Sequence, residues 1–222
     1  MRRGKQSKQP LLLGLLFTVL SVLFIFAVKY IDLEPLGLEG SNIGLAELNV
    51  VVSDAIGLNM FWYKISQMLG YVALVVVAFF ALCGVLQLIK RRSLLKVDRG
   101  ILCMGILFIV TMILYIFFDK WLINYRPFIL PGELAPESSF PSSHTMLAVV
   151  VFGATIIEFG RRLGRGTAYK IIKIIMLALM VVSVLARILS GAHWISDIIG
   201  GLLISFALIM YYKYFSGLKT RR

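Results

Sequence analysis

Long runs of apolar residues, separated by short polar segments, dominate the pattern of the chain. Six of these runs approach the roughly 20 residues that a helix needs to cross the hydrocarbon core of a bilayer. They cover residues 11–29, 68–89, 100–118, 145–159, 171–189 and 198–212. The pattern therefore predicts an all-α fold, a bundle of six transmembrane helices.

The composition agrees with an integral membrane protein. The chain has 59% hydrophobic and 15% charged residues and a mean hydropathy of +0.90, which makes it more apolar than a soluble domain. The first run follows a basic segment, as in a signal peptide, but no small-residue cleavage site follows, so we expect a retained helix. No repeat or change in composition divides the chain, and residues 1–222 are expected to form a single domain.

The basic residues predict the orientation of these helices. Most of the 23 Lys and Arg residues lie before the first run and after the second, fourth and sixth runs. With six spans these segments share one side of the membrane. The positive-inside rule makes that side cytoplasmic, with both termini on it. The net charge of +12 is thereby explained by topology and contact with membrane lipids, and nucleic-acid binding is not expected.

Several ionisable residues that the orientation does not require lie at the opposite, outer ends of the runs. Two segments, 119–144 and 186–197, flank different runs yet emerge at the same face, so their side chains can converge at one depth. These side chains are Arg126, His144, Arg187, His193 and Asp197, and Lys120 lies at the same border of the membrane.

Each residue also has an explanation without function. An arginine at a membrane border commonly snorkels to the headgroups, and a histidine near a helix end commonly packs. His193 and Asp197, four residues apart, could form a simple helix pair. Ionisable groups at membrane depth are nevertheless functional candidates, and the convergence of several at one face favours a site.

The residue types indicate phosphate chemistry. Two arginines match the geometry of phosphate oxygens. In "PSSH", Ser142 and Ser143 add hydroxyls and free N–H groups at a helix start. One histidine can attack phosphorus while the other protonates the leaving oxygen. Asp197 can hold Nδ1–H of His193 and leave Nε2 free to attack.

A zinc site is the competing use of His and Asp residues. Catalytic zinc sites usually have three protein ligands, without surrounding arginines. We therefore expect neither a metal nor another cofactor.

The order and spacing of these residues resemble the type 2 phosphatidic acid phosphatase family of membrane phosphatases. The family pattern is Lys, six residues, Arg-Pro; then Pro-Ser-Gly-His; then Ser-Arg, five residues, His, three residues, Asp. Here "RP" begins at Arg126, "PSSH" covers residues 141–144, and "ARILSGAHWISD" contains the third part. The resemblance implies that His193 is a nucleophile that forms a phosphohistidine and that Asp197 orients it. It further implies that His144 protonates the leaving alkoxide, while Arg126, Arg187 and Ser142 bind phosphate.

Three positions depart from the family pattern. Ser143 stands where the family has glycine, and Ala186 where it has serine. Asp119 occupies the position of the family's first phosphate-binding lysine, and Lys120 comes one residue late. We therefore expect Lys120 to be an auxiliary ligand of phosphate.

These observations predict a metal-independent lipid phosphatase in the cell membrane, with its active site on the extracytoplasmic side. Phosphatidic acid, phosphatidylglycerol phosphate and isoprenoid diphosphates all fit as substrate classes. The alternative is a lipid-binding or transport protein that uses the same arginines, but binding needs no pair of histidines. The segment 30–66 is open to two interpretations, an interfacial helix that admits lipid or a plain external loop. No feature of the sequence indicates an oligomeric state.

Overall fold

The computed structural model describes residues 7–130 and 132–217, and the regular secondary structure of this part is helical. Two short 3-10 helices cover Leu38–Gly40 and Leu94–Lys96. The α-helices are α1 (Gln9–Tyr30), α2 (Ala46–Ile56), α3 (Met60–Arg91), α4 (Arg99–Lys120), α5 (Ser143–Leu163), α6 (Thr167–Leu189) and α7 (Ile195–Gly217). The prediction of an all-α fold is confirmed.

Six of these helices, all except α2, are long and apolar enough to cross a membrane, as the sequence predicted. Their ends extend beyond the apolar runs, most of all in α3, which begins at Met60, eight residues before the run. The extension contains Lys64 and Gln67, because a helix keeps its backbone hydrogen bonds through polar residues that interrupt a hydropathy pattern.

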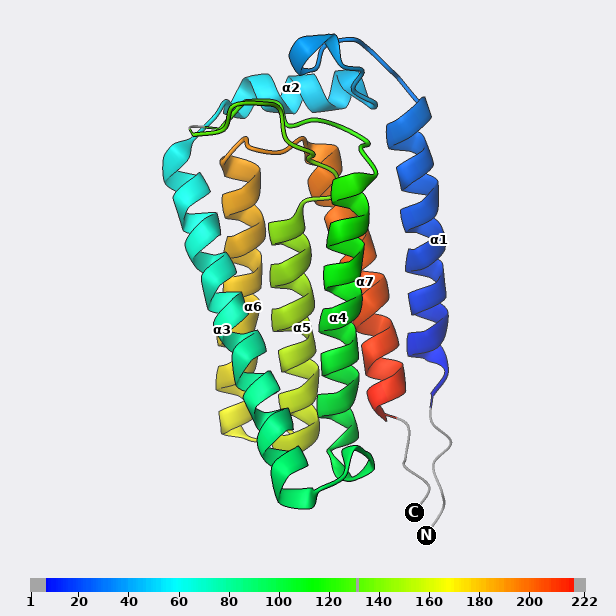
Figure 1. The fold of residues 1–222 in the computed structure, drawn as a ribbon, viewed down its shortest axis with the longest axis vertical. Coiled ribbons are helices and arrows are strands. Elements are labelled where there is room, and N and C mark those ends of the chain that lie inside the picture. The colour runs from blue at the N-terminus through cyan, green and yellow to red at the C-terminus, as the bar shows by residue number, and fades with distance from the viewer. Residues whose placement is uncertain (1–6, 131, 218–222) are drawn as a thin grey trace.

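The six long helices run side by side, and α5 lies inside the bundle they form (Figure 1). Helices α3, α4, α6 and α7 pack around α5, while α1 lies outside and packs on α7. α5 and α7 carry the longest series of buried residues, and the large apolar side chains of α1, α3, α4 and α6 are mostly exposed. Exposed apolar surface on the outer helices is what lipid tails would cover. The start of α1 and the end of α7 lie at the same end of the bundle (Figure 1).

Helix α2 lies across the opposite end of the bundle (Figure 1). Of the two interpretations of the segment 30–66, the structure shows the helix. It is tied to the start of α7 by the buried side chain of Asn49, whose Nδ2 donates to Ser196 Oγ at 2.9 Å. Asn49 Oδ1 in turn accepts from the Ser196 backbone N–H at 3.1 Å.

At the end away from α2, a buried carboxylate joins three helices. Glu158 of α5 accepts from Arg162 Nε at 2.7 Å and from the Tyr212 hydroxyl of α7 at 2.8 Å. Its carboxylate also lies directly against Gly100, at the start of α4, where a Cβ atom would collide with it. The charge is thus paired and hydrogen-bonded, as burial requires.

We expect Gly100→Ala to destabilise the protein by about 1–3 kcal/mol, because the added methyl group must displace the Glu158 carboxylate or part α4 from α5. The measurement is thermal unfolding of the purified protein in detergent. Gly105→Ala is the matched control, because a Cβ atom there meets nothing within 4 Å and alanine favours a helix. Equal melting temperatures for the two variants would contradict the packing described here.

Candidate active site

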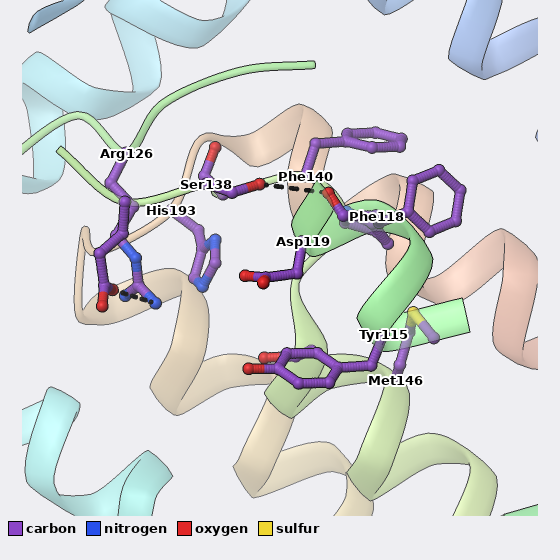
Figure 2. A pocket seen from close by; sticks show the side chains of 12 residues that line it. Tyr115, Phe118, Asp119, Arg126, Ser138, Phe140, Met146 and His193 are labelled. Carbon is purple, nitrogen blue, oxygen red and sulfur yellow. Dashed lines mark hydrogen bonds and ion pairs between the residues drawn. The ribbon is translucent and has the colours of Figure 1, made fainter. Parts of the chain in front are cut away.

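The polar residues that the sequence singled out gather at the α2 end of the bundle. The loop 121–142 crosses this end between α4 and α5, beside the short turn that joins α6 to α7 (Figure 1). Beneath the loop lies a cavity of about 230 Å³. Its polar lining includes Asp119, Arg126, Ser138 and His193 (Figure 2). Glu137, Ser139 and Ser143 also line it.

His193 is held between an acid and a base. Its Nδ1 lies 3.3 Å from Asp197 Oδ2, which also accepts from the Trp194 backbone N–H at 2.9 Å. Its Nε2 lies 2.8 Å from Arg187 Nη2. A guanidinium can only donate, so Nε2 carries the lone pair and Nδ1 carries the proton. This is the tautomer that a nucleophilic Nε2 requires.

The surroundings of His193 also keep its ring neutral. Burial lowers the pKa of His193 well below 6.5, and the positive charges of Arg187 and Arg126 lower it further. A neutral imidazole retains the lone pair that attack on phosphorus needs.

Arg187 is fully buried, with 0% of its surface exposed. Besides His193, it meets two side chains of α3. Its Nη1 donates to Ser66 Oγ at 3.2 Å, and its guanidinium lies 5.4 Å from the centre of the Tyr63 ring. Both belong to the polar start of α3, which the apolar pattern of the sequence did not include in a helix.

Arg126 has free hydrogen-bond donors. Its Nη2 pairs with Glu137 Oε2 at 3.0 Å, and its backbone N–H donates to the Glu137 carbonyl at 3.0 Å. The other two guanidinium nitrogens, Nε and Nη1, are buried and have no partner within the described part of the chain. Each of these free donors can bind an oxygen of a phosphate.

His144 lies one residue into α5 and borders a second cavity, of about 310 Å³, between α3, α4 and α5. The lining of this cavity is mostly apolar. Tyr115, Ser143 and Met146 line both cavities, so a polar space and an apolar space meet beside His144. Its Nδ1 is buried and unpaired in the residues that the structure describes.

Comparison with known families assigns the chain to one of them. The sequence pattern of the PAP2 superfamily matches residues 100–221, more than half of the chain. The chain belongs to the PAP2 superfamily. The resemblance noted from the sequence is thereby confirmed.

A solved structure supports the fold of this PAP2 superfamily member. It is the crystal structure described as that of the first transmembrane PAP2 type phosphatidylglycerolphosphate phosphatase from Bacillus subtilis. The two chains superpose with a TM-score of 0.64 over 93% of this chain and 95% of the other, at 18% sequence identity. At this identity the likeness shows a shared fold. A search of curated proteins by sequence found no match.

Three of the expected phosphate ligands of this superfamily member, Arg187, Ser142 and Lys120, do not line the polar cavity. Arg187 reaches the site through its contact with His193 Nε2 at 2.8 Å. Ser142 is fully buried, with its Oγ accepting from Thr145 Oγ1 at 3.0 Å and its N–H donating to the Asp197 carbonyl at 3.0 Å. It therefore holds the start of α5 against α7. The Lys120 side chain is 82% exposed and lies 3.9 Å from Asp119, outside the cavity lining.

Two acids, Asp119 and Glu137, also line the cavity, and the sequence predicted no role for either. Asp119 was noted only as the residue in the place of a lysine, which was the available signal. Within the described residues, no three His, Cys, Asp or Glu side chains gather as a metal site would require.

We expect the ring of His193 to titrate with a midpoint below pH 6.5, because its lowered pKa extends the neutral form to more acidic solution. The chain has only two histidines, so His144→Ala leaves one. Carbon-13 NMR of histidine-labelled His144→Ala in detergent, recorded between pH 7.5 and 5, follows that ring alone. The wild-type spectrum, with two signals, is the control. A midpoint at or above 6.5 would contradict a buried neutral imidazole.

Proposed function

We propose that the chain is a membrane lipid phosphatase that works through a phosphohistidine on His193. Membership in the PAP2 superfamily supports a phosphatase, and the six apolar helices support a multi-pass membrane protein. The observation that carries the mechanism is the hydrogen-bonded series Asp197, His193 and Arg187. It fixes the tautomer of the nucleophile and places a cation beside the attacking atom.

In the first step the phosphate of the lipid enters the polar cavity. Arg126 Nε and Nη1 donate to its oxygens, because neither has another partner within the described residues. Arg187 Nη2 moves its hydrogen bond from His193 Nε2 to a phosphate oxygen, which frees the lone pair of Nε2. The same guanidinium then stabilises negative charge that develops in the transition state.

In the second step Nε2 of His193 forms a bond to phosphorus, and the bond from phosphorus to the lipid oxygen breaks. His144 gives its proton to that oxygen, and the lipid alcohol leaves. Asp197 stabilises the positive charge on the modified ring through Nδ1–H. Water then attacks phosphorus with His144 as the base, the bond to Nε2 breaks, and inorganic phosphate departs.

The apolar cavity beside His144 supports a substrate with a hydrocarbon tail, whose leaving oxygen would lie at the boundary between the two cavities. Phosphatidic acid, phosphatidylglycerol phosphate and isoprenoid diphosphates belong to this class. The basic segments at the other end of the bundle favour an extracytoplasmic site in the cell membrane, with cytoplasmic termini. We treat residues 1–222 as one catalytic domain that needs no metal, because two arginines supply the positive charge.

The purified protein should release phosphate from a panel of lipid phosphates in detergent, with or without a chelator. Brief reaction with radiolabelled substrate should leave a phosphoprotein that is labile to acid and stable to base. We expect His193→Ala to abolish both the label and the turnover. A label that persists in this variant would remove His193 from its role. Binding of lipid phosphate without any release would favour the alternative, a binding or transport protein.

We expect His144→Ala to slow the release of an alkoxide far more than the release of p-nitrophenolate, because a good leaving group needs little protonation. The measurement is kcat for a lipid monophosphate and for p-nitrophenyl phosphate in the same detergent. Wild-type protein gives the reference ratio. Equal losses on both substrates would contradict the role of general acid.

We expect Arg187→Ala to lower kcat/KM at least about a hundredfold, or roughly 3 kcal/mol of transition-state stabilisation, because a preorganised donor is lost. Lys120→Ala should retain most of the activity, because the Lys120 side chain is exposed outside the cavity. The check is kcat/KM of both variants on one lipid monophosphate. A loss in Lys120→Ala as deep as that in Arg187→Ala would show that the lysine reaches the phosphate.

A further inference from the structure

Two carboxylates line the cavity in which the proposed function places a phosphate. Asp119 lies at the end of α4, and its side chain points into the cavity toward His193 (Figure 2). Glu137 comes from the loop and pairs with Arg126 at 3.0 Å. In a space of about 230 Å³ the negative charges of these two carboxylates repel a bound anion. The two acids must therefore affect which phosphates bind.

The charges around the cavity cancel one another before any phosphate binds. Arg126 in the lining and Arg187 behind His193 bring two positive charges, and Asp119 and Glu137 in the lining bring two negative charges. Each further negative charge of a ligand is therefore uncompensated, and a diphosphate brings more of them than a monophosphate. Lys120 lies 3.9 Å from Asp119, but its side chain is 82% exposed, so water and salt weaken its compensation. A second phosphate bonded to the first would add negative charge with no further cation in the lining.

Resting on the proposed function, we propose that Asp119 and Glu137 are specificity residues that select lipid phosphate monoesters over lipid diphosphates. Asp119 comes from α4, whereas His193 comes from the turn between α6 and α7. When a phosphate lies between Asp119 and His193, one of its oxygens or the leaving group bonded to it faces Asp119. A carboxylate there accepts a hydrogen bond from a hydroxyl group and repels a second phosphate.

The test compares two substrates with the same isoprenoid tail, one a monophosphate and one a diphosphate. The quantity measured is the ratio of kcat/KM for the diphosphate to kcat/KM for the monophosphate. Wild-type protein should have a ratio below one. Asp119→Asn, which keeps the shape of the side chain, should raise the ratio about fivefold or more, and Asp119→Lys should raise it further. Glu137→Gln should raise it in the same direction.

Glu133→Gln is the matched control, because Glu133 is an exposed acid of the same loop that does not line the cavity. Its ratio should equal that of the wild type. An unchanged ratio in Asp119→Asn, with phosphate still released from both substrates, would overturn the selectivity and leave the phosphatase intact. An equal rise in Glu133→Gln would also overturn it. No release by wild-type protein from any lipid phosphate would overturn the proposed function itself.

A different observation, at the other end of the bundle, carries a second proposal. A cavity of about 1000 Å³ lies where the α3–α4 connection meets the end of α5. Its charged lining consists of Arg91, Lys96, Asp98, Arg99, Glu158, Arg161 and Arg162. Five basic side chains therefore face two acidic ones.

The two acids fix part of this cluster in place. Asp98 pairs with Arg91 at 2.7 Å and with Arg162 at 3.2 Å, and the hydrogen bond from Arg91 leads the interactions that lower the pKa of Asp98. Glu158 pairs with Arg162 at 2.7 Å. These contacts neutralise two arginines and preorganise their remaining donors.

The other cations are only partly compensated. Arg161 reaches Glu158 at 3.4 Å, Lys96 has no side-chain partner within the described residues, and Arg99 Nε donates to the Phe215 carbonyl at 2.8 Å. Leu95 lines the same cavity and is 91% exposed, so an apolar side chain stands beside the excess charge. A phosphate bearing acyl chains satisfies both features.

We propose that this cavity binds the phosphate headgroup of an anionic phospholipid in the leaflet opposite the active site. Basic pockets between transmembrane helices bind such headgroups. The same hydrogen-bond donors would also bind a free phosphate ion, so the experiment compares the lipid with inorganic phosphate.

The probe is dioctanoyl phosphatidylglycerol, a phosphodiester that a monoesterase does not hydrolyse. Thermal unfolding of the full chain in detergent should shift upward with this lipid, because a ligand of the native state stabilises it. Dioctanoyl phosphatidylcholine should have little effect. The double variant Lys96→Gln, Arg161→Gln should need about fivefold or more lipid for half of the shift.

The matched control is Lys90→Gln, Arg165→Gln, which removes one cation near each of the same helix ends, outside the cavity lining. It should behave as the wild type. Equal weakening in both double variants would overturn a specific site and show an effect of net charge. A shift with inorganic phosphate that equals the lipid's at the same concentration would assign the cavity to a free anion and overturn the lipid proposal.

Discussion

A fully buried guanidinium is the constraint on which the active end of this protein depends. Removing a cation from water is expensive unless its hydrogen bonds and charge are satisfied. Arg187 of α6 finds partners on α3, through Ser66 and Tyr63, and in His193 before α7. Three segments that are distant in sequence must therefore hold one arrangement, and that arrangement sets the direction of the His193 ring.

Packing at the same end makes this arrangement rigid. Gly200 and Gly201 of α7 leave room for the ring of Phe140 and for the backbone of Ser142, where a Cβ atom would collide or press. The start of α5 can then approach α7 closely enough for the Ser142 N–H to reach the Asp197 carbonyl at 3.0 Å. His144 and His193 are thus positioned by backbone contact between two helices and not by loops alone.

Much of this could be predicted from the sequence, because a membrane helix leaves a run of about 20 predominantly apolar residues. The six spans, the face shared by His144, His193 and the arginines, and the pairing of His193 with Asp197 follow from runs and spacing. The polar start of α3 could not be found in this way, because Lys64 and Gln67 break the apolar pattern while the helix continues. The Asp119 side chain points into the cavity because of where α4 ends, and the spacing of residues in the sequence does not determine that end. The hydrogen bond from Thr145 to the Ser142 hydroxyl likewise depends on local packing, which the sequence does not reveal.

The ion pair between Arg126 and Glu137 bears on the end of the catalytic cycle as well as its start. Glu137 Oε2 pairs with Nη2 of Arg126 at 3.0 Å. When the phosphate leaves, the guanidinium of Arg126 therefore keeps an ion-pair partner, the carboxylate of Glu137. Inorganic phosphate presents the same kind of charged oxygens as the lipid ester, so it would bind the same arginine donors. In the proposed mechanism, Glu137 competes with the released phosphate for the arginine 3.0 Å away, so the acid that weakens capture also speeds product release.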